Sequence, residues 1–350
     1  MLQQFRGIEI KALSACIPKR IVGNDAFEDL IAGKELRMFE RTVGITSRRW
    51  AEDGVTATDL GFEAASILFS EHPELKENIS ALVFLSQTPD YKLPFSSNIL
   101  QDKLGLGREL LCLDLNAGCA GFVQGLGTAF SLASPVKNGR VLLIIAETMS
   151  RMLSYKDRGT TLLFGDGAAA MIIENTGDGS VESAFEYFTD GAHFDAIMIP
   201  EGGYRKPATA ESLIEKEDAA GNKRTGLNLY MDGARVFDFT LREIAPSITK
   251  ILTDSDTSKD DVDYFLMHQS NRFIIQQIAA QLGIPSEKAL LNIETSGNTS
   301  GVSIPLLMSE KQEQVSKGKT LVCSGYGVGL NWANCILKNQ KIKFTPLQEV

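Results

Sequence analysis

The sequence predicts an α/β fold with helices on both faces of its sheets, built as two duplicated halves. Short apolar runs alternate with segments of helical periodicity, and runs such as Val141–Ala146 are apolar throughout, as in strands buried on both faces. The order of elements that begins at Ile79 recurs from Val262 onward. A repeat of this size indicates duplication of one unit about a pseudo-twofold axis, and we divide the chain into residues 1–176 and 177–350.

Composition limits the classes of function. The chain has 350 residues, 43% of them apolar and 23% charged, and a net charge of −9. Such a chain is a poor candidate for binding nucleic acid or anionic membranes, and its apolar runs are too short to insert into a bilayer. Five cysteines without a C-x-x-C pair, and only three histidines, indicate reduced thiols and argue against a metal site. We expect a cytoplasmic protein without bound metal.

Periodicity and capping signals divide the first half into elements. We expect strands at 7–13, 79–85, 110–115 and 140–146, a polar loop at 15–23, and helices at 24–39, from a Thr58 cap to 72, and at 96–104. Gly165, Asp166 and Gly167 predict a tight turn between sheet segments 160–164 and 168–174.

The second half opens on a segment of different character. Residues 200–228 are polar and lack periodicity, so we expect a long loop that is a candidate lid over a site. A helix is expected at about 231–252, kinked or interrupted by Pro246. A strand at 262–268 and a glycine-rich hairpin at 325–329 follow.

Cys119 lies where an apolar run turns into a helix. Leu110–Leu115 has the character of a buried strand, and Phe122, Leu126 and Phe130 then recur at helical spacing. The positive helix end and its unpaired N–H groups favour a thiolate, and small neighbouring residues allow a ligand to approach closely. The alternative is one more buried core cysteine, and this stretch alone does not separate the two.

The repeat places two further polar residues beside Cys119. The turn that holds Cys119 corresponds to Gly297-Asn298 in the second half, and equivalent helix N-termini face each other about a twofold axis. His268 ends a strand at the edge where α/β sheets bind ligands. The three side chains fit either a protease-like triad or a condensing site in which the cysteine carries an acyl group. The Gly325–Gly329 loop can aim N–H groups at an oxyanion, which supports acyl transfer in both versions.

Five segments together resemble the motifs of β-ketoacyl-acyl-carrier-protein synthase III, a condensing enzyme of the thiolase fold. They follow one another in the order of that family and span nearly the whole chain: Asp114–Phe122, Arg158–Ala168, His268–Asn271, Gly297–Ser300 and Gly325–Gly329. The resemblance implies a five-layered αβαβα fold, a homodimer and no bound cofactor.

The resemblance also implies roles for single residues. Cys119 attacks an acyl thioester and holds the acyl group. His268 and Asn298 hydrogen-bond the carbonyl of a malonyl-type extender while its decarboxylation gives an enolate. The enolate then attacks the acyl group, and the backbone N–H groups of Cys119 and Val328 hold the resulting oxyanion. Val328 stands where the family usually has glycine.

Carrier contacts follow from the same resemblance. Arg158 matches a position that contacts the adenine of coenzyme A, and Asn271 one beside the pantetheine. Met38 stands about where the family has a tryptophan. Arg41 opens a basic segment that is either a solvated loop or a contact to phosphate groups of the carrier.

Three further residues carry expectations about docking and chain length. Arg48 and Arg49 belong to a solvated face or to a surface that docks the acidic carrier protein. Leu93 lies near the position from which the dimer partner closes the acyl pocket. A leucine there in place of phenylalanine would admit a longer or branched acyl chain.

The sequence therefore predicts a β-ketoacyl-acyl-carrier-protein synthase III-like acyltransferase of fatty-acid initiation or a specialised pathway. Its substrates are thioesters of coenzyme A or acyl-carrier protein, and the carrier protein is its partner. Two alternatives stay open. One is acyl transfer to an oxygen or nitrogen acceptor, and the other is a non-catalytic partner subunit of a condensing complex.

Overall fold

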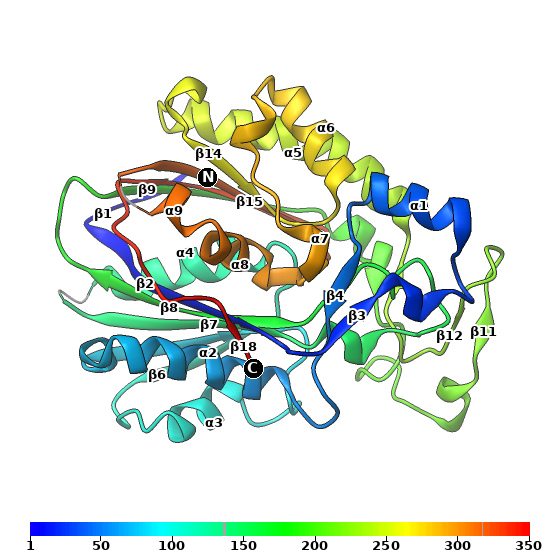
Figure 1. Ribbon diagram of the computed structural model, residues 1–350. Helices are drawn as coiled ribbons and strands as arrows, with labels where there is room; N and C mark the ends of the chain where they lie inside the picture. The colour runs from blue at the N-terminus through cyan, green and yellow to red at the C-terminus, as the bar shows by residue number, and fades with distance from the viewer. Residues whose placement is uncertain (136–137, 317) are drawn as a thin grey trace.

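The computed structural model describes residues 1–135, 138–316 and 318–350, and stacks two sheets between three layers of helices (Figure 1). From bottom to top of Figure 1 the layers are helix, sheet, helix, sheet and helix. The predicted five-layered αβαβα fold is confirmed.

The lower sheet has seven strands and comes mainly from the first half of the chain. Its order is β17-β2-β8-β7-β5-β6, with β18 beside β2. The strands are β2 (Ile8–Ile17), β5 (Ile79–Leu85), β6 (Leu111–Leu115), β7 (Arg140–Glu147), β8 (Gly167–Asn175), β17 (Lys343–Phe344) and β18 (Gln348–Glu349). Strand β5 runs parallel to both β6 and β7, so their carboxyl ends meet at one edge. Helices α2 (Ala57–Glu71) and α3 (Ser96–Lys103) cover the outer face.

The upper sheet has five strands in the order β1-β9-β16-β15-β14. They are β1 (Gln3–Arg6), β9 (Glu182–Thr189), β16 (Asn331–Lys338), β15 (Thr320–Gly327) and β14 (Tyr264–Met267). Helices α5 (Gly233–Asp254) and α6 (Arg272–Leu282) cover its outer face. Each sheet also contains strands from the other half of the chain. The upper sheet contains the N-terminal strand β1, and the lower sheet contains the C-terminal strands β17 and β18. The division at residue 176 stays a proposal.

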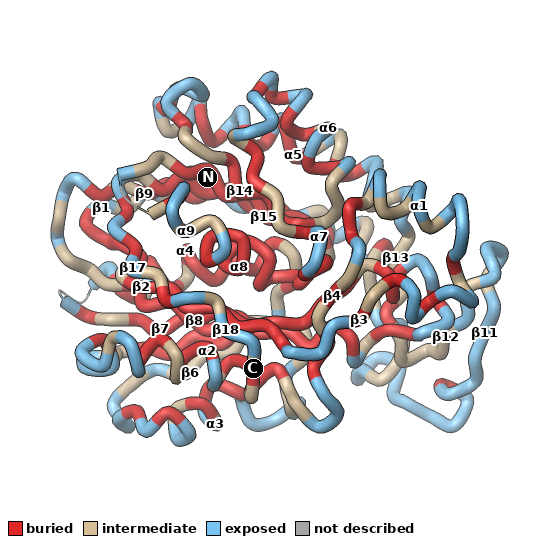
Figure 2. Tube along the Cα trace, viewed as in Figure 1, coloured by how far each residue is buried: buried red, intermediate tan, exposed pale blue. Residues whose placement is uncertain are grey.

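The middle layer holds the core between the sheets. Helices α4 (Gly121–Ala133) and α8 (Ser303–Glu310) lie there, and α4 packs on strands of both sheets. Phe122, Leu126 and Phe130, the side chains spaced helically in the sequence, are fully buried in one apolar cluster with both sheets. Figure 2 shows the strands and middle helices buried, with exposed residues confined largely to the outer helices and loops.

The remaining elements are short and lie mostly at the right of Figure 1. The strands are β3 (Ile21–Gly23), β4 (Ser47–Arg49), β10 (Ile197–Met198), β11 (Lys216–Glu217), β12 (Lys223–Arg224) and β13 (Tyr230–Met231). The α-helices are α1 (Gly33–Thr42), α7 (Ile293–Ser296) and α9 (Gln312–Val315). The 3-10 helices are η1 (Asn24–Phe27), η2 (Pro73–Lys76), η3 (Met149–Met152), η4 (Gly191–Ala196), η5 (Ala210–Leu213), η6 (Lys259–Asp261), η7 (Ser286–Lys288) and η8 (Ser300–Val302).

Several predicted boundaries were wrong. The helix expected at 24–39 is split into η1 and α1, and Gly33, the first residue of α1, takes a left-handed φ of +57° where the second helix begins. The loop expected at 15–23 is largely strand, since the buried residues up to Ile17 continue β2. Thr56 caps α2 in place of Thr58, through a capping box with Asp59. Helix α5 runs through Pro246 as part of one helix.

Arg48 is a structural residue, so both expectations for it were wrong. Its side chain is fully buried. The guanidinium donates to the carbonyls of Val22 (3.1 Å) and Leu162 (2.8 Å) and to Asn24 Oδ1 (2.5 Å). Burial lowers the pKa of Arg48 to about 10. A cation that holds three acceptors in the interior cannot dock a carrier.

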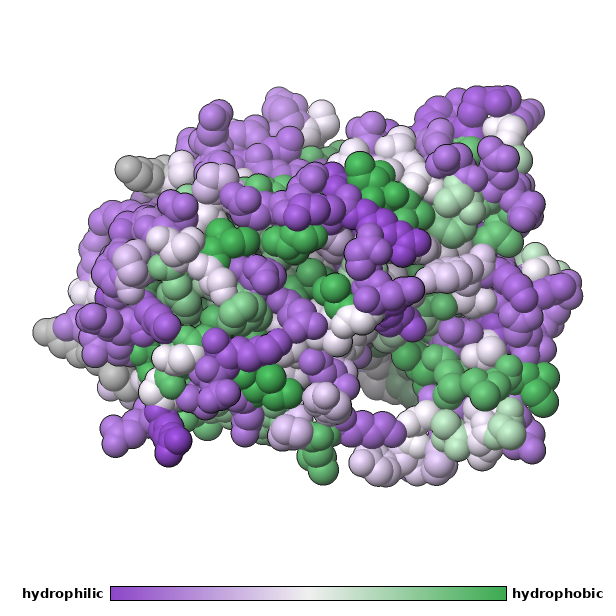
Figure 3. All heavy atoms as spheres, turned by 60° about the horizontal axis from the view of Figure 1, so that its bottom comes forward, coloured by the Kyte–Doolittle hydropathy of each residue, from purple (hydrophilic) through white to green (hydrophobic). Residues whose placement is uncertain are grey.

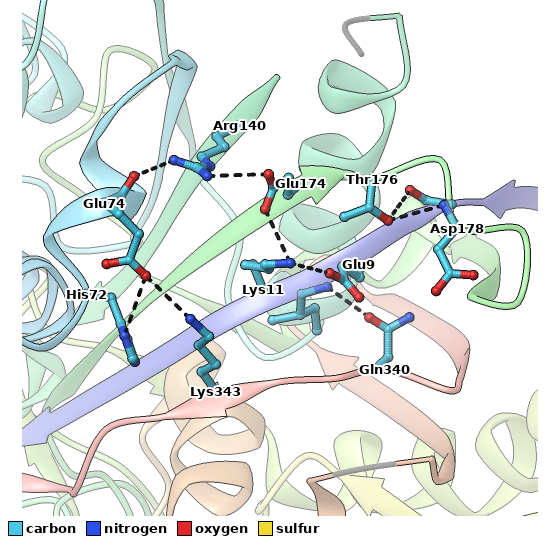
Figure 4. A network of polar contacts seen from close by, with 12 residues as sticks. Glu9, Lys11, His72, Glu74, Arg140, Glu174, Thr176, Asp178, Gln340 and Lys343 are labelled. Atoms are coloured by element: carbon cyan, nitrogen blue, oxygen red, sulfur yellow. Dashed lines mark hydrogen bonds and ion pairs between the residues drawn. The ribbon is translucent and has the colours of Figure 1, made fainter. Parts of the chain in front are cut away.

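Polar contacts tie the C-terminal segment back to the lower sheet (Figure 4). Gln340 Oε1 accepts a backbone N–H of β2 at 2.8 Å, and Lys343 Nζ lies 3.4 Å from Glu74 Oε1. Arg49, also expected at a docking surface, is mostly buried and pairs with Glu349 at 2.7 Å. Among the described residues, no helix has both the length and the apolar character required to cross a membrane.

Replacing Arg48 should destabilise the protein strongly. Arg48→Ala leaves three buried acceptors without a donor, so we expect the free energy of unfolding to fall by about 3–5 kcal/mol. Chemical denaturation at one protein concentration measures it. The matched control is Arg41→Ala at an exposed position of α1, with an expected change within about 0.5 kcal/mol. A loss at Arg48 as small as that of the control would contradict the assignment.

Candidate active site

A cavity of about 670 Å³ opens where the carboxyl ends of β5, β6 and β14 meet the ends of α4, α5 and α6. Cys119, His268 and Asn298 all line it, so the structure brings together the three side chains that the repeat predicted. The rest of the wall is largely apolar, with contributions from Met149, Met152, Leu163, Phe164, Ile197, Leu229, Met231 and Phe237. An enclosed apolar wall with a few convergent polar groups is typical of a substrate pocket.

Cys119 lies between β6 and α4, with Ala120 as the residue that precedes the helix. Glycines of the β15 end pack directly against it. A Cβ on Gly327 would lie 2.7 Å from Cys119 Cβ and 2.9 Å from its sulfur, and a Cβ on Gly325 would lie 2.8 Å from the Cys119 carbonyl oxygen. The backbone can therefore approach the sulfur only because these positions lack side chains.

The surroundings of Cys119 favour its thiol over the thiolate. Burial raises its pKa to about 11, while hydrogen bonds with the Ser300 hydroxyl and with the backbone N–H groups of Val328 and Cys119 act in the opposite direction. The sequence led us to expect a thiolate favoured by the helix end, and the structure corrects this. Burial beside apolar side chains destabilises the thiolate by more free energy than these hydrogen bonds stabilise it.

His268 is 1% exposed and ends β14. Its Nδ1 lies 2.7 Å from Ser303 Oγ, and the ring of Tyr326 meets it edge-on at 5.5 Å between centroids. Burial lowers the pKa of His268 to about 3, with only a partial offset from the backbone at Ser300. The imidazole is therefore neutral at physiological pH.

Asn298 is held by backbone contacts with the segment around Gly165, where the sequence predicts a tight turn between two sheet segments. Its N–H donates to the Leu163 carbonyl (2.8 Å) and its carbonyl accepts from the Gly165 N–H (3.0 Å). Residues 160–164 thus bridge to Asn298, and the predicted strand there was wrong. The side-chain oxygen accepts from the Ser300 N–H at 2.9 Å, which leaves the amide nitrogen as the donor toward the cavity.

Residues that the sequence analysis passed over support this centre from below. Glu147 is fully buried and accepts the backbone N–H of Gln87 (3.1 Å), and Gln87 Oε1 accepts from the Ser300 hydroxyl (3.3 Å). Burial raises the pKa of Glu147 to about 8. Their positions in the sequence could have identified them, because Gln87 and Glu147 both follow predicted strands and so lie at the carboxyl ends where the site forms.

The predicted carrier contacts do not lie together in one site. Asn271 lines the cavity and caps α6 by accepting the Ile274 N–H at 2.8 Å. Arg158 and Met38 line a separate groove outside the cavity, where Arg158 pairs with Glu35 at 2.7 Å. Arg41 is exposed in the last turn of α1 and lines neither hollow.

Two further expectations concern loops. Leu93 is 77% exposed and lies outside the cavity wall of its own chain. Residues 200–228, expected as a lid, contribute nothing to the wall. The wall takes residues 197–199 from before this segment and Leu229 and Met231 from after it. The hairpin of β11 and β12 in this segment instead packs on the loop before Arg158, where Arg224 pairs with Asp157 at 3.0 Å.

Within the described part of the chain, no three His, Cys, Asp or Glu side chains converge as metal ligands.

Comparison with known proteins identifies the family. Residues 113–191 match the family model of 3-oxoacyl-[acyl-carrier-protein] synthase III, and residues 252–339 match the model of its C-terminal part. The β-ketoacyl-[acyl-carrier-protein] synthase III of Natranaerobius thermophilus is 30% identical over 335 residues, 94% of this chain and 98% of that protein. This chain belongs to the β-ketoacyl-acyl-carrier-protein synthase III family.

Other members agree in sequence and fold. The synthase III of Streptococcus pyogenes is 31% identical over 334 residues, 94% of this chain and 98% of the relative. The crystal structure of a 3-oxoacyl-(acyl-carrier-protein) synthase from Burkholderia xenovorans matches with a TM-score of 0.91 at 33% identity, over 100% of this chain and 99% of the other. The crystal structure of 3-oxoacyl-(acyl-carrier-protein) synthase III from Pseudomonas aeruginosa matches with a TM-score of 0.80 at 29% identity, over 97% of this chain and 100% of the other. The expected family, its thiolase-like fold and its class, condensing acyltransferases of fatty-acid synthesis, are confirmed.

The reactivity of Cys119 should keep rising with pH. Because the thiol pKa is raised to about 11, the fraction of thiolate grows about tenfold per pH unit between pH 7 and 9. Alkylation of Cys119 by iodoacetamide, followed by peptide mass spectrometry, should show this slope. A plateau that begins near pH 7 would mean that the thiolate is already stabilised.

Glu147 should make the protein less stable as pH rises. Its pKa is raised from 4.5 to about 8, so the folded state keeps a proton that the unfolded state releases. The free energy of unfolding then falls between about pH 5 and pH 8, with a slope that approaches about 1.4 kcal/mol per pH unit. Glu147→Gln removes this titration and should flatten the curve relative to the parent in urea unfolding. Parallel curves for the two proteins would refute the assignment.

Proposed function

We propose that this protein loads an acyl group from a thioester onto Cys119 and condenses it with a malonyl-type thioester by decarboxylation. The observation that carries the proposal is the presence of Cys119, His268 and Asn298 on one enclosed wall. Relatives at 30–31% identity are named β-ketoacyl-acyl-carrier-protein synthase III. Nothing in the geometry or the comparisons favours either alternative, acyl transfer to oxygen or nitrogen or a non-catalytic subunit.

In the first step the Cys119 sulfur attacks the thioester carbonyl. The backbone N–H groups of Cys119 and Val328, which both line the cavity and act to lower the pKa of the thiol, are the proposed donors for an oxyanion on the carbon bonded to the sulfur. The thiol proton leaves with the thiol of the carrier, so the step is balanced without a permanently ionised cysteine. Val328 supplies its N–H although its side chain differs from the glycine usual in the family.

In the second step His268 and Asn298 hold the carbonyl of the extender. Both are neutral, His268 because burial lowers its pKa and Asn298 by its chemistry. Neutral donors fixed in a dry site stabilise the enolate that forms as carbon dioxide leaves, and they gain most in the transition state. The enolate carbon then attacks the acyl group on Cys119, and the same N–H pair holds the new oxyanion.

The substrates we propose are thioesters of coenzyme A and of acyl-carrier protein. A cavity of about 670 Å³ with a largely apolar wall has room for the end of a pantetheine arm and an acyl chain. Asn271 is the proposed contact to the arm. Arg158 and Arg41 lie on the outer surface beside α1 and are the proposed contacts to the rest of the carrier.

We also propose a homodimer that forms through the edge strand β6 and the loop before α3. This loop exposes Tyr91 (61%), Leu93 (77%) and Phe95 (46%), and β6 exposes Leu111 (50%). The two are neighbours, since the backbone at the start of α3 donates to Asp114 of β6. Figure 3 turns the bottom of Figure 1 forward and shows hydrophobic patches there among hydrophilic side chains. An edge strand that pairs with β5 on one side only and lies beside apolar side chains suits pairing with a second copy, which would bring Leu93 to the partner's pocket.

Acylation should depend on Cys119 alone among the cysteines. After incubation with a panel of acyl-coenzyme A and acyl-carrier thioesters, intact-mass spectrometry should show one acyl group on the parent and none on Cys119→Ala. Cys112→Ala, which removes another partly exposed cysteine, is the control and should still be labelled. A label that persists in Cys119→Ala would show that another residue is the nucleophile.

His268 and Asn298 should act after acylation. His268→Ala and Asn298→Ala each remove one donor to the enolate, so we expect release of carbon dioxide from a malonyl thioester to fall about 10²–10³-fold. Acyl loading of Cys119 should stay within a fewfold of the parent. Product formation from an acylated protein without release of carbon dioxide would instead support transfer to oxygen or nitrogen.

A further inference from the structure

We propose that the hydroxyl of Ser303 is a positioning group that fixes the tautomer of His268, so that the ring carries its single proton on Nε2. Ser303 is the first residue of α8 and is 2% exposed, and His268 at the end of β14 is 1% exposed. Their side chains meet at 2.7 Å between Ser303 Oγ and His268 Nδ1. The tautomer itself does not depend on the proposed function, and only its effect on decarboxylation rests on that function.

The direction of this hydrogen bond follows from the other contacts of Ser303. Its oxygen lies 3.4 Å from the backbone nitrogen of Gln269, which acts only as a donor. The hydroxyl hydrogen is then free to donate, and the acceptor that it faces among the described residues is His268 Nδ1. The nearby carbonyl of Ser300 accepts the backbone N–H of Ser303 and also interacts with the His268 ring, whose pKa it raises. Donation to this carbonyl from Nδ1 would be the opposite tautomer, which the NMR experiment below distinguishes. A neutral ring that accepts at Nδ1 carries hydrogen on Nε2.

Packing and backbone hydrogen bonds fix the position of His268 beside this partner. Tyr326 is 2% exposed, meets the imidazole edge-on at an interplanar angle of 82°, and its hydroxyl donates to the His268 carbonyl at 3.2 Å. The backbone N–H of His268 is tied to the Ser324 carbonyl at 2.8 Å. With Nδ1 turned toward α8, the opposite side of the ring, with Nε2, faces the cavity that His268 lines.

The tautomer decides what His268 can do. With hydrogen on Nε2, the imidazole donates to the carbonyl of the extender and helps its decarboxylation. The same nitrogen cannot accept the proton of the Cys119 thiol, because it is already protonated and the ring is neutral. His268 is then a dedicated donor in this protein, and acylation of Cys119 proceeds without it as a base.

Nitrogen NMR tests the tautomer directly. The chain has only three histidines, so ¹⁵N-histidine labelling gives few signals, and His72→Gln and His193→Gln assign them. We expect the parent to show a protonated Nε2 and an unprotonated Nδ1 for His268, and Ser303→Ala to lose this preference. A proton on Nδ1 in the parent, or the same tautomer in Ser303→Ala, would overturn the proposal.

Kinetics tests the consequence. Ser303→Ala should slow decarboxylation of a malonyl thioester about 10–100-fold, while acyl loading of Cys119 stays within about twofold. Ser303→Thr keeps a hydroxyl and should recover part of the rate. Ser309→Ala is the matched control, because Ser309 is a buried serine of the same helix whose hydroxyl bonds to no described residue.

The outcomes separate the two proposals. Equal losses of loading and decarboxylation in Ser303→Ala, or equal losses in Ser303→Ala and Ser309→Ala, would indicate a packing role and overturn the positioning role. If the parent itself loads no acyl group on Cys119, the proposed function fails, and the NMR result still decides the tautomer.

Discussion

Burial of polar groups in the layer between two sheets is the constraint on which the rest of the structure depends. Helices α4 and α8 fill this layer, and Cys119 and Asn298, which line the cavity, lie in the segments that precede them. In this dry interior the charged forms of Cys119, His268 and Glu147 are all disfavoured, so burial raises the pKa of the two acids and lowers that of the imidazole, and each neutral form is favoured. The centre therefore consists of neutral groups and backbone N–H donors, which suits a reaction whose negative charge appears only in passing.

Close approach of backbone segments from different halves supplies the geometry. A Cβ on Gly165 would lie 2.2 Å from the Ser296 carbonyl oxygen, and one on Gly297 would lie 2.8 Å from that of Leu163. The two turns can interlock only as glycines, and their contact holds Asn298 at the cavity. Gly327 plays the same part beside Cys119. These glycines serve contact between segments, which a local pattern of turn residues does not reveal.

The arginines of this chain have different roles according to how deeply they are buried. Arg48, deep in the interior, binds carbonyl and amide oxygens and stabilises the junction of β3 and β4 with the turn before Gly165. Arg158 lies at the surface, where its pairing with Glu35 leaves it reachable from solvent. Basic residues that look alike in sequence thus have different partners, and only the exposed ones remain available to a carrier.

The sequence by itself determined the alternation of strands and helices, the duplicated order of elements, and the set Cys119, His268 and Asn298, because these follow from local periodicity and from motifs with fixed order. The tertiary structure alone decided which turns meet, which arginines are buried, and how the Cys119 thiol is ionised. It also revealed Gln87, Glu147, Ser300 and Ser303 beneath the centre. Each of these depends on contacts between residues far apart in the chain, and burial acts through such contacts rather than through the residue type.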